Sequence, residues 1–173
     1  MLFHLKLIIK KNALIIDYKS EINMETINDE QKSSFELGEY NFEKVPIGKL
    51  VCISLKCTIK DIFKENMSKT IITGTCDNKR LKEKITYKGE FGEDLSIPYY
   101  NINTNQYSTM IFYKGKKLSD NYEFALLRAY SVFYYFQKNH IPINGENTEF
   151  KIQSINEEGK RFCDFSITFK NYF

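Results

Sequence analysis

The pattern of apolar and polar positions predicts several short strands that alternate with two helices. Residues 69–74, KTIITG, form a β-branched run that ends in glycine, and the carboxylate of Asp77 follows three residues later. Residues 149–155 (EFKIQSI) and 161–169 (RFCDFSITF) are also rich in β-branched and aromatic residues, and the second run alternates apolar with polar positions. A period of two is typical of a strand with one buried face.

The most regular helical pattern covers residues 120–140. Asp120 can cap the first turn, with Glu123 three positions later in a capping box, and Pro142 stops the helix. Arg128 falls on the flank of an apolar stripe, which we expect to pack on a sheet. The stripe, at spacings i, i+4, i+7 and i+11, consists of Ala125, Ala129, Val132 and Phe136.

Three other segments complete the expected order of elements. Residues 49–66 fit both periodicities, but eighteen residues without Gly or Pro favour a helix. Residues 35–42, FELGEYNF, are interpreted as a strand that enters a loop. Residues 79–118 hold short β-prone runs separated by Gly, Pro and Asn, and predict a β-rich insertion. The expected fold is therefore an α/β sandwich, with two main helices on one mixed sheet.

The N-terminal region is expected to lie outside this domain. Residues 1–17 predict a two-stranded ribbon that turns near Lys11 and Asn12, although Met24 could instead be the true start of the chain. The polar residues 20–34 resemble a linker, which places the domain at 34–173. The longest apolar run in the ribbon is three residues, so we expect neither a membrane-spanning helix nor an export signal here.

Composition narrows the classes of function. The 173 residues include 25 Lys and Arg and 22 Asp and Glu, interspersed, so a net charge of +3 does not favour nucleic acid or an anionic membrane as a partner. Four cysteines without C-x-x-C spacing and two histidines at opposite ends predict buried thiols and no metal or cofactor. We find no Cys-His arrangement, phosphate-binding glycine loop or paired carboxylates that would indicate an enzyme.

Three stretches together resemble the OmpA-like C-terminal domain, the peptidoglycan-associated family that includes Pal lipoproteins and the flagellar stator protein MotB. These stretches are residues 35–42, residues 71–78 (IITGTCDN) and residues 121–136. In that family a strand ends in a G-H-T-D-like turn, and the next helix has the pattern N-x-x-L-S-x-x-R-A-x-x-V-x-x-Y-L. The residues at those offsets here are Asn121, Phe124, Ala125, Arg128, Ala129, Val132, Tyr135 and Phe136.

The resemblance implies non-covalent binding of diaminopimelate in a peptidoglycan stem peptide, and a location in the periplasm or cell envelope. Diaminopimelate presents a carboxylate and an ammonium on one carbon. By the resemblance, Arg128 would hold the carboxylate and Asp77 the ammonium. Asn121 would add a hydrogen bond near the helix N-terminus, where partial positive charge favours an anion. Thr75 and Asn78, in the same turn as Asp77, complete the expected ligand-binding set.

The chain also departs from the family pattern. Thr75 stands where the family has histidine, and Cys76 where it has threonine. The N-R-R-V-E segment of the family is only loosely matched by residues 159–165, in which Lys160 and Arg161 would take the basic positions. The insertion at 79–118 could cover the pocket, extend it, bind a different ligand or contact other envelope proteins.

Two alternatives stay open from the sequence. Asp77 and Arg128 could form a salt bridge with each other, worth about 0 to 1 kcal/mol when partly exposed. The domain would then be an OmpA-like scaffold for protein interactions that has lost peptidoglycan binding, and because no export signal is visible it could be cytoplasmic.

Overall fold

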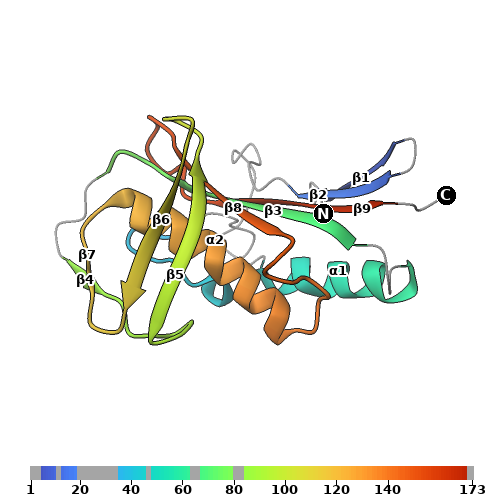
Figure 1. Cartoon of the computed structure of the whole chain (residues 1–173), viewed down its shortest axis with the longest axis horizontal. Coiled ribbons are helices and arrows are strands. Elements are labelled where there is room, and N and C mark those ends of the chain that lie inside the picture. The colour runs from blue at the N-terminus through green and yellow to red at the C-terminus, as the bar shows by residue number, and fades with distance from the viewer. Residues whose placement is uncertain are drawn as a thin grey trace.

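The computed structural model describes residues 5–10, 13–18, 35–45, 48–62, 67–79 and 84–170. Its centre is a seven-stranded sheet, with two helices on the same side of that sheet (Figure 1). The helices are α1 (Gly48–Ile62) and α2 (Asn121–Lys138), and a 3-10 helix, η3 (Phe42–Lys44), precedes α1. The expectation of an α/β fold with two helices on one mixed sheet is therefore confirmed.

The sheet is built around β3 (Met67–Cys76). Antiparallel β9 (Cys163–Lys170) lies on one side of β3, and parallel β8 (Thr148–Ser154) lies on the other. The full strand order is β1-β2-β9-β3-β8-β5-β6. Because α2 connects the insertion to β8, it crosses back over the sheet and packs mainly on β3 and β8.

The insertion is rich in strands, as its sequence predicts. β5 (Asp94–Asn101) and β6 (Gln106–Tyr113) form a hairpin that joins the main sheet where Tyr100 and Asn101 pair with β8. β4 (Ile85–Thr86) and β7 (Lys117–Leu118) form a small separate sheet. In Figure 1 the hairpin runs steeply across the direction of the central strands.

The prediction of a strand at residues 35–42 is wrong. Gly38 has a φ of 80°, in the left-handed region, which breaks an extended chain here. Asn41 then accepts a hydrogen bond from the Glu43 N–H and caps η3. Phe35, Tyr40 and Phe42 are nevertheless buried, so the apolar pattern was set by core packing of a turn and not by strand alternation.

The N-terminal ribbon contributes to the main sheet. β1 (Leu5–Lys10) and β2 (Ala13–Tyr18) pair as predicted, and β2 also pairs along its whole length with β9. Residues 11 and 12 of the expected turn and the linker residues 20–34 lie outside the described residues. The ribbon therefore supplies the strands beyond β9, although the sequence placed it outside the domain.

Burial of the cysteines differs from expectation at one position. Cys52, Cys76 and Cys163 are buried free thiols, but Cys57 is exposed. On α1, Cys57 follows the fully buried Leu55 by two residues, which rotates it by about 200° to the outer surface. The prediction that Cys57 is buried was based on its apolar neighbours in the sequence, and these do not indicate the direction in which its side chain points.

Close packing between α2 and β3 positions the site. The predicted stripe on α2 is fully buried, and its alanines let the helix backbone approach the strand. A Cβ at Gly74 would lie 1.9 Å from the carbonyl oxygen of Ala125 and 3.2 Å from the amide nitrogen of Ala129. Position 74 therefore requires glycine because the helix backbone occupies the place of a side chain.

Gly74→Ala tests this contact. We expect the substitution to lower the free energy of unfolding by about 2 to 4 kcal/mol, because backbone atoms cannot move aside as a flexible side chain can. Gly145→Ala is the matched control, since the nearest atom to its added Cβ is 4.0 Å away. Urea unfolding of both variants measures the difference, and an equal, small loss in both would contradict the close approach.

Candidate functional site

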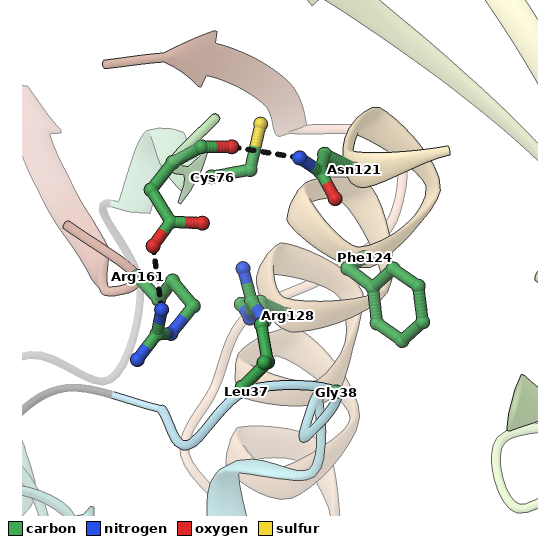
Figure 2. Close-up of a pocket in the computed structure, with 8 residues that line it drawn as sticks. Leu37, Gly38, Cys76, Asn121, Phe124, Arg128 and Arg161 are labelled. Carbon is green, nitrogen blue, oxygen red and sulfur yellow. Dashed lines mark hydrogen bonds and ion pairs between the residues drawn. The ribbon is translucent and has the colours of Figure 1, made fainter. Parts of the chain in front are cut away.

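A small pocket lies at the point where β3 ends. It contains about 200 Å³ of empty space, counting the part that opens to solvent. The end of β3, the first turns of α2, the loop before η3 and the β8–β9 connection all contribute to it (Figure 2). Its lining residues are Leu37, Gly38, Cys76, Asp77, Asn121, Phe124, Arg128 and Arg161.

Asp77 leaves the end of β3 and is almost completely buried, with 2% of its surface exposed. Its Oδ2 accepts hydrogen bonds from the Gly159 N–H at 2.9 Å and from Nη1 of Arg161 at 2.5 Å. Both donors belong to the β8–β9 connection. Asp77 is therefore held by a segment far along the chain, and its ion pair is with Arg161.

Arg128 lies about two helical turns inside α2 and is also 2% exposed. Its Nε donates to the Glu39 carbonyl at 3.0 Å, and its Nη1 donates to the Thr75 carbonyl at 2.8 Å. Burial lowers the pKa of Arg128 to about 10, so the group remains charged at neutral pH. Among the described residues, no carboxylate lies within ion-pair distance of Arg128. The alternative of a direct salt bridge between Asp77 and Arg128 is therefore wrong.

Asn121 joins the start of α2 to the end of β3. Its Nδ2 donates to the Asp77 carbonyl at 2.8 Å and to the Lys79 carbonyl at 3.3 Å. The helix N-terminus itself is already occupied, because Asp120 and Glu123 form the predicted capping box. The partial positive charge of this terminus therefore faces a carboxylate of the chain, and Asn121 mainly fixes the backbone that carries Asp77.

Thr75 and Asn78, two of the five predicted site residues, do not line the pocket. The Thr75 hydroxyl accepts from the Phe162 N–H at 2.8 Å and lies 3.0 Å from the Lys160 carbonyl, to which it can donate. Asn78 donates to Asn156 at 2.7 Å. Both side chains instead attach the β8–β9 connection to the end of β3.

Arg161 is a charged residue of the pocket that the ligand-binding prediction left out. Besides its contact with Asp77, its Nε donates to the Phe35 carbonyl at 3.1 Å, and its own carbonyl accepts from the Phe35 N–H at 2.6 Å. The signal was present in the sequence, because Arg161 occupies a basic position in the segment that loosely matches N-R-R-V-E. Its pairing with a residue 84 positions away required the fold.

The charges of the pocket do not cancel. Two guanidinium groups and one carboxylate line it, so it carries one net positive charge. Asp77 and Arg161 neutralise each other, which leaves Arg128 as the charge without a direct ionic partner among the described residues. Figure 2 shows the Arg128 guanidinium pointing into the space bounded by Cys76, Asn121 and Arg161. The arrangement is suited to hold a small anion.

No protein-family model matches the chain, and no curated protein is significantly similar to it. Within the described residues, three or more His, Cys, Asp or Glu side chains do not gather anywhere in a way that could hold a metal ion. None of the helices in the part of the chain that the structure describes is long and apolar enough to cross a membrane.

The Thr75 hydroxyl gives a direct test of how the β8–β9 connection is held. Thr75→Val keeps the shape but leaves the buried Phe162 N–H without its partner, so we expect a loss of about 1 to 3 kcal/mol in the free energy of unfolding. Thr75→Ser keeps the hydroxyl and should lose clearly less. Chemical denaturation compares the two, and a valine variant as stable as the serine variant would contradict this role.

Glu39, whose carbonyl holds Arg128, gives a pH-dependent test. Burial alone would raise the pKa of Glu39, but hydrogen bonds from Lys44 and from the Asn41 and Tyr40 N–H groups outweigh it and lower the pKa from 4.5. Because the pKa falls on folding, the ionised carboxylate stabilises the protein above about pH 4.5, and this contribution is lost as the pH falls through the lowered value.

We therefore expect Glu39→Gln to lower the free energy of unfolding by up to about 1 kcal/mol near pH 7, and by less near pH 3. The exposed Glu146→Gln is the control and should show little change at either pH. Urea unfolding at both pH values makes the comparison. A Glu39→Gln deficit that grows on acidification has the wrong sign for this account.

Proposed function

We propose that this pocket binds the α-amino carboxylate headgroup of diaminopimelate, and that the chain is a non-covalent peptidoglycan-binding module of the cell envelope. The observation that carries the proposal is the buried guanidinium of Arg128, which faces the pocket without a carboxylate partner among the described residues. A buried charge is costly unless an opposite charge or several hydrogen bonds compensate it. Two backbone carbonyls compensate Arg128 in part, and a ligand carboxylate would complete the balance.

The second charge of the headgroup would be met by Asp77. The hydrogen bonds that Asp77 accepts from described residues are both made through Oδ2, so Oδ1 remains for a ligand ammonium. Asp77 and Arg128 come from different elements and line the same pocket without pairing. This separation is what a group with a carboxylate and an ammonium on one carbon requires.

The dimensions support a small headgroup as the ligand. The empty space of about 200 Å³ includes the part that opens to solvent, so its enclosed part can admit only a small group. A headgroup at the end of a longer chain fits such a site, because the rest of the stem peptide can remain outside. The resemblance of residues 71–78 and 121–136 to the OmpA-like family supports diaminopimelate as the specific headgroup and the envelope as its location.

A second candidate is the scaffold without peptidoglycan binding. The burial of Asp77 and Arg128, and the pairing of Asp77 with Arg161, favour it, since all three groups already have structural roles. The partner surface would then be the β5–β6 hairpin. Tyr107, Ile111 and Tyr113 are 76%, 61% and 53% exposed there. Alternate residues of a strand share a face, so these three side chains form one outward row.

Sedimentation with purified sacculi separates the two candidates. A binding module should pellet with insoluble sacculi that contain diaminopimelate, and free diaminopimelate should release it. Arg128→Gln removes the charge that would meet the ligand carboxylate, so we expect at least about a tenfold loss of binding. Lys114→Gln is the control, because it removes the same charge from an exposed side chain.

The outcomes are distinct. Failure of the parent chain to pellet would exclude the binding module and leave the scaffold. A parent that pellets together with an Arg128→Gln variant that pellets equally well would show that binding occurs elsewhere on the chain. Circular dichroism of each variant establishes that the fold is retained.

A further inference from the structure

Arg161 occupies the side of the pocket at which a ligand ammonium would bind. Its Nη1 donates to Asp77 at 2.5 Å, so a cation of the chain already sits on the carboxylate that the ligand would need. Figure 2 shows Arg161 and Arg128 on different sides of the same space. The pocket thus holds its own substitute for the positive half of the ligand and, among the described residues, none for the negative half.

The two arginines are held differently. Arg128 is 2% exposed and donates to the carbonyls of Glu39 and Thr75, so its position is set by the packed interior. The Arg161 side chain is 14% exposed, and apart from Asp77 it donates to the Phe35 carbonyl at 3.1 Å. Because Arg161 lies closer to solvent, water can replace its hydrogen bonds more readily when it moves away from Asp77 than water could replace those of Arg128.

This difference determines how much each charge of a ligand contributes to its affinity. A carboxylate that meets Arg128 gains an interaction with a guanidinium that lacks an ionic partner among the described residues. An ammonium that meets Asp77 must share that carboxylate with Arg161 or displace it, and the new ion pair then replaces an old one of similar strength. The ammonium therefore adds little net affinity while Arg161 is in place.

We propose that Arg161 is a specificity-determining residue that neutralises Asp77, so that the pocket selects the carboxylate of its ligand and is nearly indifferent to the ammonium. The inference rests on the proposed function, because it concerns the same pocket and the same headgroup. Without Arg161, Asp77 would carry an unpaired negative charge. It would then attract the ammonium of an amino acid and repel a carboxylate that lacks one.

The test compares meso-diaminopimelate with pimelate, which has the same carbon chain and carboxylates but no amino groups. Isothermal titration of the full chain with each ligand, at one ionic strength, gives the ratio of the two affinities. For the parent we expect affinities within about threefold of each other. For Arg161→Gln we expect pimelate to bind at least about tenfold more weakly than diaminopimelate, because like charges then face each other.

Two further variants control for charge and for position. Arg161→Lys keeps a cation beside Asp77 and should keep the ratio of the parent. Lys160→Gln removes the same charge from the neighbouring position, whose side chain pairs with Glu157 at 3.6 Å, and should also keep that ratio. Thermal unfolding of each variant establishes that it is folded before titration.

Each result has one meaning. A parent that binds neither ligand overturns the proposed function and this inference with it. A parent that binds both, with a ratio that Arg161→Gln leaves unchanged, overturns the inference alone. If Arg161→Gln does not fold, the affinities of the parent chain alone test the inference. A preference for diaminopimelate over pimelate above about thirtyfold overturns it, and near-equal affinities for the two ligands support it.

Discussion

The contact between Gly74 of β3 and the backbone of α2 is the constraint on which the rest of the site depends. Because the helix carbonyl of Ala125 occupies the place of a side chain at position 74, α2 lies closer to the sheet than ordinary side chains permit. Arg128, three residues further along the helix, is then within reach of the Thr75 carbonyl.

Once Arg128 is in place, the surrounding structure follows from the need to satisfy a buried cation. The Glu39 carbonyl is directed at its Nε, which fixes the loop before η3, and Phe35 lies 5.4 Å from its guanidinium. The same loop holds Arg161 through its backbone and side chain. Arg161 in turn pairs with Asp77. The pocket is thus a charge network of four segments, and its net positive charge is a property of all of them together.

Much of the architecture could be predicted from the sequence because it depends on local pattern. The capping box of α2, its alanine face and the strands around Gly74 and Phe165 follow from residue types at short spacing. The strand expected at residues 35–42 shows where this reasoning fails. Buried aromatic residues in a tight turn mimic the alternation of a strand, and the left-handed Gly38 was the sign of the turn.

The candidate site was predictable in part, for a similar reason. Asp77, Asn121 and Arg128 belong to a strand–helix pattern that the sequence displays, and all three line one pocket. Thr75 and Asn78 were placed there by proximity in sequence, but the Thr75 hydroxyl and the Asn78 amide hydrogen-bond to the β8–β9 connection instead.

The sequence by itself determined which elements form and which residues could carry charge at the end of β3, since short-range spacing sets both. Only the tertiary structure decided how those charges are paired. Arg161 reaches Asp77 because antiparallel β9 starts beside the end of β3, and the N-terminal ribbon joins the sheet because β9 has an edge to pair with. Pairings of this kind join residues far apart in the chain, and no local pattern records them.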